Sequence, residues 1–280
     1  MPALHLATGE TCTIEKAPRG KVNIDEISDN VLASFDIVIT NDATSTLSSR
    51  DAISHLVQIP TIHFGGFHPD VVYMRLKEDS SIPVFDTRNA SASGLALFAF
   101  NHGFSIQKAR ELYTHEIYHK LKFLDYFDIS CETLMQSFLT SGLKTDLLEK
   151  FLVGRDVFMH GPLHPKQPVV TSLVYALMEK EGMKPVVSMD SLNQILRDPK
   201  EYEYAWSCFP PMAKSLGIAG GWGVRLQNQF FLNIDSYLTH FYDFMENAPK
   251  AIEMAPADKE RFEHFHCIYS LLGKNNANTL

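Results

Sequence analysis

The chain has 280 residues, of which 45% are hydrophobic and 21% are charged, and its formal net charge is −8. With 19 Phe and 10 Tyr it carries too much apolar surface for a disordered chain. The acidic balance argues against nucleic-acid binding, which normally needs a basic stripe, although a few local cations can still hold a phosphate. The longest apolar runs, such as Leu95–Phe100, fall well short of the roughly 20 residues that span a bilayer.

The four cysteines lie far apart, at Cys12, Cys131, Cys208 and Cys267, and form no C-x-x-C pair. This spacing does not suggest a disulfide framework. No basic segment followed by an apolar one opens the sequence, as it would in a secretory signal. We therefore expect a cytoplasmic protein in a reducing environment.

Short β-branched and apolar runs predict buried strands, and the segments between them predict helices. The strands are expected at Phe35–Thr40, Pro60–Phe64, Val157–His160 and Pro185–Met189, and helices at Ser48–Val57 and Pro168–Glu181. This alternation is typical of an α/β protein with a mostly parallel sheet flanked by helices. Because loops at the carboxyl ends of such strands usually form the site, the turns after these runs are the candidate positions.

The middle of the chain has a different pattern. From about Ala90 to Phe151 the sequence predicts helix, with Ser105 as an N-cap and apolar residues at three- and four-residue steps from Ile106 to Leu124. We interpret residues 90–151 as a helical insertion within a single α/β domain that spans residues 1–280. Two closing helices are expected at Ser236–Met245 and Asp258–Leu272.

Two groups of histidines match metal-site patterns. His115-Glu116-Ile117-Tyr118-His119 has the H-E-x-x-H spacing of zinc proteases, in which two histidines one turn apart hold the metal. The apolar stripe of this helix runs through Ile117, so both histidines point toward the solvated face. In His264-Phe265-His266-Cys267 the histidines are two residues apart and cannot share a helix face. We expect no metal at either position.

Two His-Pro turns are the stronger candidates for chemistry. Gly65-Gly66-Phe67-His68-Pro69-Asp70 follows the run PTIHF, and Gly161-Pro162-Leu163-His164-Pro165-Lys166 follows VFMH. Glycine permits a sharp turn and proline fixes it, so both imidazoles are expected at one edge of the sheet. A neutral imidazole there can take a proton from a hydroxyl or a thiol. The alternative is that the two histidines bond loop carbonyls and only brace the turns.

Two further segments follow strand or helix patterns. Asn41 leaves the run FDIVIT and is a candidate donor to an oxyanion, with capping of the next turn as its alternative role. The glycine-rich stretch Gly217–Arg225 ends in a cation and is a candidate loop for binding a phosphate or an adenine. It lacks both the G-x-G-x-x-G and the P-loop spacing.

Four segments follow one another along the chain: IPTIHFGGFHPDVVYM, LALFAFNHGFSIQKARELYTHEIYHKLKFLDYFD, DVFMHGPLHPKQPVVTSLVYALM and FPPMAKSLGIAGGWGVRL. In this order they resemble the WcbI family of polysaccharide-biosynthesis enzymes. The F-H-P-D and M-H-x-x-x-H-P elements are the specific parts, and the resemblance covers roughly Val31 to Arg225. It implies a coenzyme A-binding acyltransferase of capsule assembly, which moves an acetyl-type group to a sugar hydroxyl.

The resemblance also suggests roles for the candidate residues. His68 or His164 would be the general base, Asp70 would orient an imidazole, and Asn41 or backbone N–H groups would meet the oxyanion. Three cations are suited to the phosphates of coenzyme A: Lys166, Arg225 and Arg75. One imidazole, His160, is also assigned to the coenzyme. The alternatives are an esterase-like hydrolase and a non-catalytic coenzyme-binding member.

One feature of the family differs at the start of the chain. The family opens with a strand and a Gly-Asn-Cys-Gln turn into a helix, whereas the nearest string here is Gly9-Glu10-Thr11-Cys12, with Pro18 and Gly20 soon after it. Residues Lys21–Asp25 predict at most one short edge strand. We therefore expect that the natural reading frame extends upstream of Met1; the alternative is a member that works without this cysteine.

Overall fold

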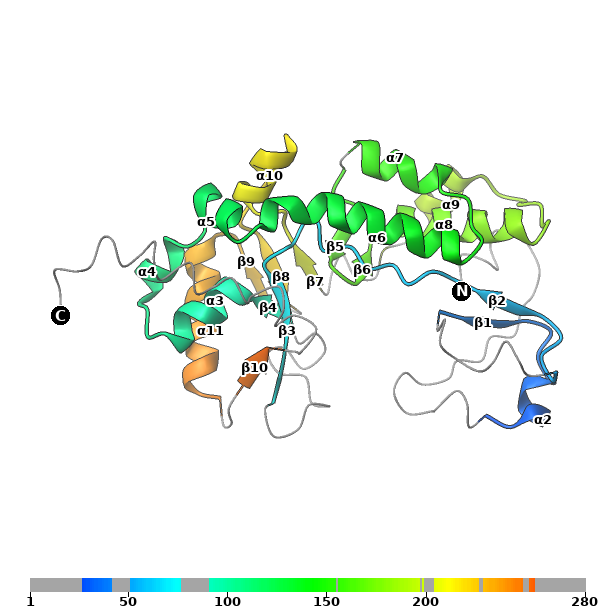
Figure 1. Cartoon of the computed structure of the whole chain (residues 1–280), viewed down its shortest axis with the longest axis horizontal. Helices are drawn as coiled ribbons and strands as arrows, with labels where there is room; N and C mark the ends of the chain where they lie inside the picture. The colour runs from blue at the N-terminus through cyan, green and yellow to red at the C-terminus, as the bar shows by residue number, and fades with distance from the viewer. Residues whose placement is uncertain are drawn as a thin grey trace. The chain divides into compact units, whose positions relative to one another are not determined.

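The computed structural model describes residues 27–41, 51–76, 91–154, 156–196, 198, 204–226, 229–248 and 252–254 (Figure 1). These residues form a mixed α/β structure, which confirms the predicted fold class at that level. They group into two compact units, each built from three separate segments. The first contains residues 1–62, 132–153 and 167–197, and the second contains residues 63–131, 154–166 and 198–280. A single domain with a helical insertion stays a prediction.

The first unit combines two short parallel strands with helices. β1 (Val38–Thr40) pairs with β2 (Leu56–Gln58). The helices are α2 (Asp29–Leu32), most of α6 (Tyr126–Thr140), α7 (Asp146–Gly154), α8 (Gln167–Lys180) and α9 (Met189–Ile195). Val174 and Met178 of α8 pack against Leu192 of α9 in a small apolar core. Burial of such side chains stabilises the helix pair by roughly 1.5–3 kcal/mol for each residue.

The described strands of the second unit form antiparallel sheets. β3 (Val71–Leu76) lies between β4 (Ser91–Ser93) and β10 (Ile252–Met254). β5 (Met159–Gly161) and β6 (His164–Pro165) form a hairpin, and β8 (Val224–Leu226) lies between β7 (Tyr204–Trp206) and β9 (Gln229–Phe231).

The prediction of a mostly parallel sheet is not confirmed. Among the described strands only β1 and β2 pair in parallel, and the pairings of the second unit are antiparallel. β6 begins three residues after β5 ends, and β9 begins three residues after β8 ends. Parallel neighbours need a crossover of a dozen or more residues, so connections this short allow only antiparallel pairing.

Helices cover the sheets of the second unit. They are α3 (Gly94–Asn101), α4 (Ile106–Arg110), α5 (His115–Lys120), the 3₁₀ turn η3 (Phe123–Asp125), α10 (Pro210–Leu216) and α11 (Ile234–Glu246). α11 contacts both α3 and α4, and Figure 1 shows it beside them. Its buried face carries Tyr237, Leu238 and Phe241, which are fully enclosed.

Two of the predicted helices are confirmed, as α8 and α11. The predicted helix at Ser48–Val57 is wrong in its described part, because Leu56–Gln58 forms β2 through pairing with β1. The predicted strand Pro60–Phe64 is also wrong: Pro60 has no N–H to donate, and the backbone N–H of Phe64 bonds the Pro162 carbonyl instead. These segments depend on distant partners that a local pattern does not contain.

Two other strand predictions need adjustment. The run Phe35–Thr40 is a strand only over Val38–Thr40, and the run Val157–His160 shifts to β5. The predicted strand Pro185–Met189 is wrong, because Ser188 accepts a hydrogen bond from the Ser191 backbone N–H and caps α9. Cys12, residues 21–25 and the predicted helix at 258–272, with its histidine cluster, lie outside the described residues.

The helical middle of the chain is interrupted rather than continuous. Ser105 caps α4 as predicted, by accepting from the Lys108 N–H at 3.2 Å. Thr114 then caps a new helix, α5, by accepting from the Ile117 N–H, and Lys122 has a φ of 58° before η3. The expected run from Ile106 to Leu124 is therefore three short segments, and β4 precedes them.

Candidate functional site

The turn that carries His68 is fixed by close packing of aromatic rings. Phe64 and Phe67 are fully buried and contact the rings of Phe127 and Phe158 at centroid distances of 4.7–5.5 Å. A Cβ on Gly66 would lie 2.8 Å from the Phe127 Cα, so only glycine fits between them. The turn therefore holds the following imidazole in one position.

His68 is buried and neutral. Its Nε2 lies 2.8 Å from the Trp206 carbonyl oxygen, which only accepts, so Nε2 carries the proton and donates. Burial lowers the pKa of His68 to about 4, and the charges of Lys166 and His160 act in the same direction, against the bond to Trp206. The predicted neutral imidazole is present, but it is enclosed: only 3% of the residue is exposed.

A cavity of about 10 Å³ lies beside this imidazole. Its lining includes His68, Asp70, Tyr118 and Trp206. Three residues of this lining each carry a buried side-chain atom that has no hydrogen-bond partner among the described residues: His68 Nδ1, Tyr118 Oη and Trp206 Nε1. A buried polar group without a partner costs roughly 1–3 kcal/mol, so each of the three lowers the stability of this part of the unit.

Asp70 holds the start of α3. Its Oδ1 accepts from the Leu95 backbone N–H at 2.8 Å, and its Oδ2 accepts from the Ser93 hydroxyl at 2.5 Å. A carboxylate at a helix N-terminus is stabilised by the exposed N–H groups there. The structure thus places Asp70 at a helix terminus, whereas the sequence predicted that it orients an imidazole.

A second imidazole is paired with a carboxylate. His160, on β5, has its Nε2 2.7 Å from Asp198 Oδ2, and the side chains are 8% and 14% exposed. His160 and Lys166 both act electrostatically on His68, and all three residues belong to the second unit.

The other predicted residues of this unit lie in strands. His164 is half-buried in β6, opposite Gly161 of β5, and Arg225 is half-buried in β8. Arg75 of β3 faces Glu253 of β10, and its Nε and Nη2 donate to Glu253 Oε1 at 3.0 and 2.7 Å. This ion pair engages Arg75 within the sheet, which does not fit a phosphate role.

The glycine-rich stretch packs against its own unit. Gly217 ends α10 with a φ of 70°. A Cβ on Gly220 would lie 2.4 Å from Ala213 Cβ, and one on Gly223 would lie 3.0 Å from Ser207 Oγ. The Trp222 ring packs on Phe209. The glycines permit this close packing, and a role of the stretch around a phosphate or an adenine stays a prediction.

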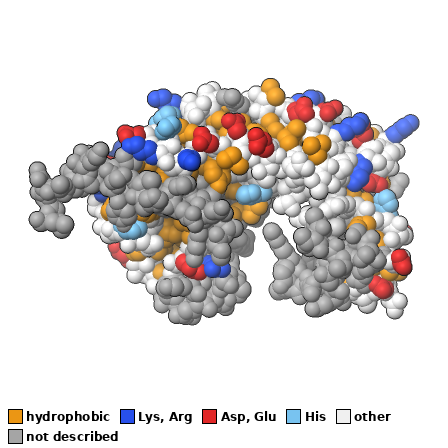
Figure 2. Space-filling view, viewed as in Figure 1, with side chains coloured by type: hydrophobic (Ala, Val, Ile, Leu, Met, Phe, Trp, Pro, Cys, Tyr) orange, Lys and Arg blue, Asp and Glu red, His pale blue; other side chains and the backbone are white. Residues whose placement is uncertain are grey.

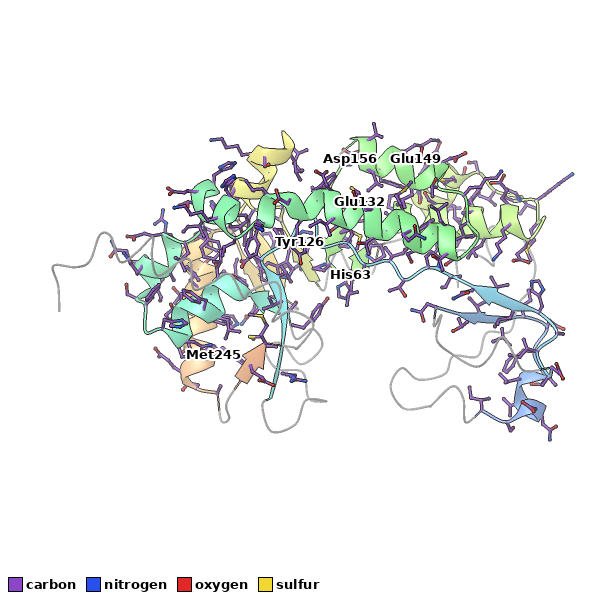
Figure 3. The ribbon with its side chains drawn as sticks, in the orientation of Figure 1. His63, Tyr126, Glu132, Glu149, Asp156 and Met245 are labelled. Atoms are coloured by element: carbon purple, nitrogen blue, oxygen red, sulfur yellow. The ribbon has the colours of Figure 1, made fainter. Side chains whose placement is uncertain are left out.

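Asn41 lies in the first unit, at a groove of about 550 Å³. The groove is lined by Asn41, by residues 58–61 at the end of β2 and just beyond it, and by one face of α6 with the turn that follows it. Most of its described lining consists of neutral amide and hydroxyl side chains. Glu132, labelled on α6 in Figure 3, is the acidic residue among them.

A scan of protein families matches "Polysaccharide biosynthesis enzyme WcbI" over residues 21–186, which is more than half of the chain. The chain belongs to the WcbI family. A search of curated proteins finds no match. Among solved structures, the chain is similar to a WcbI protein described as a novel polysaccharide biosynthesis enzyme, in its native form without a disulfide bond between coenzyme A and a cysteine. The two share 14% identity and a TM-score of 0.65, over 96% of this chain and 91% of that one.

The zinc-protease pattern has a different role in this WcbI-family chain. His115, Glu116 and His119 are exposed on α5, as the apolar stripe predicted, and Glu116 pairs with Lys120 at 2.8 Å. Within the described part of the chain, no group of three potential metal ligands comes together. Tyr118, a variable position of the pattern, is the residue that reaches the buried cavity.

The sequence prediction did not include three residues near His68 and His160, namely Asp198, Trp206 and Tyr118. Asp198 precedes Pro199 after a helix and resembled an ordinary loop, although the residue before a proline is held extended. Trp206 and Tyr118 carry a polar atom on a large apolar ring, which is the signal for a buried hydrogen bond. That signal was present in the sequence, although Trp206 Nε1 and Tyr118 Oη have no hydrogen-bond partner among the described residues.

Two further observations concern the surface and the thiols. Burial raises the pKa of the Cys208 thiol to about 12, so it stays protonated and is a poor nucleophile near neutral pH.

On the face in view, Figure 2 shows acidic and basic side chains interspersed rather than in a stripe of one sign. None of the described helices is long and apolar enough to cross a membrane.

Proposed function

We propose that this WcbI-family chain is a coenzyme A-dependent acyltransferase, which moves an acetyl-type group to a sugar hydroxyl in polysaccharide or capsule biosynthesis. The family supports the polysaccharide context, and the similar solved structure is described together with coenzyme A. A cytoplasmic location belongs to the same proposal. The observation that carries the reaction type is the His160–Asp198 pair, because transfer to a hydroxyl needs a base that is held in place.

His160 fits the base better than His68 does. Nε2 of His160 donates to Asp198, which leaves the lone pair on Nδ1 to take a proton. The carboxylate stabilises the imidazolium that forms. The low pKa of His68 makes it a weak base, and its cavity has room for no more than about a water molecule. His164 is the competing candidate.

Acetyl-coenzyme A supplies the acyl group as a thioester. His160 takes the hydroxyl proton as the acceptor oxygen bonds the acyl carbon, the carbon–sulfur bond breaks, and the proton passes to the departing thiolate. Lys166 lies close enough to affect the pKa of His68, and its charge is suited to a phosphate of the coenzyme. Arg225 stays a candidate for a second phosphate, and Asn41 or backbone N–H groups for the oxyanion.

Titration calorimetry with coenzyme A and with 3′-dephospho-coenzyme A tests the coenzyme. We expect coenzyme A to bind, its dephospho form to bind more weakly, and a concentration of about 100 times Kd to stabilise the fold by roughly 2.7 kcal/mol. An unchanged melting temperature at millimolar coenzyme A would contradict the proposal.

Acetyl-coenzyme A turnover then separates the alternatives. Release of free thiol that depends on added sugar supports acyl transfer. Release of free acetate without any sugar would favour an esterase-like hydrolase. Binding without turnover of any acceptor would favour a non-catalytic coenzyme-binding member.

A further inference from the structure

The groove of the first unit lies where its two parallel strands end. β1 ends at Thr40 and β2 ends at Gln58, and the lining of the groove includes Asn41 and residues 58–61. In open α/β sheets, ligands bind in the crevice outside the carboxyl ends of the strands. The volume of about 550 Å³ falls within the range of small-molecule sites, which is roughly 300–1,000 Å³. The groove therefore has the position and the size of a binding site.

The rest of the lining is one face of α6 and the turn after it. These residues recur at four-residue steps, so they lie above one another in two rows along the helix. The rows are Glu132, Gln136 and Thr140, and Thr133, Ser137 and Ser141. Each of the six carries an amide, a hydroxyl or a carboxylate, so this face presents polar groups along its whole length.

Several polar groups of the groove are only weakly engaged with one another. Gln136 Nε2 donates to Thr140 Oγ1 at 3.4 Å. The hydroxyls of Ser137 and Thr61 donate, also at 3.4 Å, to the carbonyls of Thr61 and Asn41 respectively. Good hydrogen bonds of these kinds are roughly 2.5–3.2 Å long. A ligand can therefore replace these contacts with shorter ones at little cost.

The lining favours an uncharged ligand with many hydroxyl groups. An amide side chain both donates and accepts, as a sugar hydroxyl does, and the Glu132 carboxylate accepts. No Lys, Arg or His is among the described residues of the lining, so an anion would meet no cation there and would be repelled by Glu132. Lys180 donates to the Ser141 carbonyl at 2.9 Å and is not a lining residue. Ile59 and Pro60 add apolar atoms that suit the C–H groups of a sugar ring.

We propose that this groove binds a neutral saccharide. The amides of Asn41, Gln58 and Gln136 bond its hydroxyl groups, and Glu132 accepts from another hydroxyl (Figure 3). The choice of a saccharide among polyhydroxy compounds rests on the polysaccharide context of the proposed function, whose acceptor is then an uncharged sugar. Binding itself needs neither coenzyme A nor acyl transfer.

Nuclear magnetic resonance titration of the full chain, without coenzyme A, tests the proposal. The probes are millimolar disaccharides of glucose, of mannose and of galactose, each compared with the disaccharide of its uronic acid. We expect at least one neutral disaccharide to shift the side-chain amide signals of Asn41 and Gln136. Its uronic acid form should bind roughly fivefold more weakly, because the carboxylates are repelled by Glu132.

Two substitutions locate the site. Gln136→Ala removes one amide and keeps a good helix former, so we expect it to raise the Kd of the neutral disaccharide roughly fivefold, which is about the worth of one hydrogen bond. Glu132→Gln should bring the Kd of the uronic acid form close to that of the neutral one. Gln194→Ala is the matched control, since Gln194 is exposed on α9 of the same unit and does not line the groove, and it should leave both Kd values unchanged.

Four results would overturn the proposal: no binding by any of the three neutral disaccharides, tighter binding of a uronic acid form, a neutral complex that Gln136→Ala does not weaken, or shifts of the same amide signals by coenzyme A alone. The proposed function fails separately. If a disaccharide binds in the groove while coenzyme A binds nowhere on the chain, acyl transfer from coenzyme A is contradicted and the saccharide site stands.

Discussion

The two concave regions of this chain differ in enclosure and in chemistry. The cavity of the second unit is about 10 Å³, is lined mainly by buried aromatic rings and an imidazole, and contains a histidine with a strongly lowered pKa. The groove of the first unit is about 550 Å³, and the described residues that line it include amides, hydroxyls and Glu132 but no Lys, Arg or His. In the proposed function, proton transfer belongs to the second unit through the His160–Asp198 pair, whereas the groove offers a polar surface with one acidic side chain among its described lining.

The largest effect should come from the base. His160→Gln keeps a donor toward Asp198 but cannot take a proton, so we expect acyl transfer to fall by about 10²–10⁴-fold while coenzyme A still binds. Thiol release from acetyl-coenzyme A in the presence of the acceptor sugar measures the rate, and calorimetry measures binding.

Two controls distinguish the base from its neighbours. His115→Gln, on the exposed face of α5, should leave the rate unchanged. His164→Gln should lower it far less than His160→Gln. If His164→Gln has the larger effect instead, the base is His164, one of the two histidines that the sequence indicated.

The next effect concerns the burial of His68. It should appear in the pH dependence of the free energy of unfolding. Folded His68 titrates near pH 4 and an unfolded histidine near 6.5, so the unfolded state binds more protons between these values. Stability should therefore fall as the pH drops from about 6.5 to 4, by about 3 kcal/mol for this group. Denaturant unfolding of the wild type and of His68→Gln measures it. Equal pH dependence in the two proteins would show that His68 is open to water.

Asp70 tests whether a carboxylate beside the cavity anchors a helix or assists the chemistry. Asp70→Asn weakens the bonds to Ser93 and to the Leu95 N–H, so we expect a loss of roughly 2 kcal/mol in the free energy of unfolding. Activity per folded molecule should stay nearly intact. A large loss of activity with unchanged stability would restore the role predicted from the sequence.

Sequence patterns located the parts of this chain that are determined locally. The apolar periodicity found α8 and α11, the capping residue Ser105 was correct, and the exposed face of His115 and His119 followed from the position of Ile117. The family was also recognised from residue order. For the helices, the cap and the exposed face, the deciding neighbours lie within a few positions of one another.

Tertiary pairing accounts for most of the misses. β2 exists because Leu56–Gln58 pairs with β1, and β3 pairs antiparallel with β10, which lies far along the chain. His160 was assigned to the coenzyme, and its carboxylate partner Asp198, 38 residues away, was not recognised. Arg75 seemed suited to a phosphate until β10 placed Glu253 opposite it. None of these partners is visible in a local window.

The smallest expected effect is on the Kd for coenzyme A. It shows which cation contacts the coenzyme and in which of the two regions the coenzyme binds. Lys166→Ala should weaken coenzyme A binding roughly tenfold, or about 1.4 kcal/mol, because a charged bond to phosphate is worth about that much. Arg75→Ala should change Kd by less than twofold, since its guanidinium is already engaged by Glu253. Gln136→Ala, in the groove of the first unit, is the matched control and should also leave Kd unchanged. Calorimetry on the three variants, repeated with 3′-dephospho-coenzyme A, decides among them: if Lys166 contacts the 3′-phosphate, its substitution no longer matters for the dephospho form. A stronger effect of Gln136→Ala than of Lys166→Ala would move the coenzyme to the groove and reverse the comparison between the two regions.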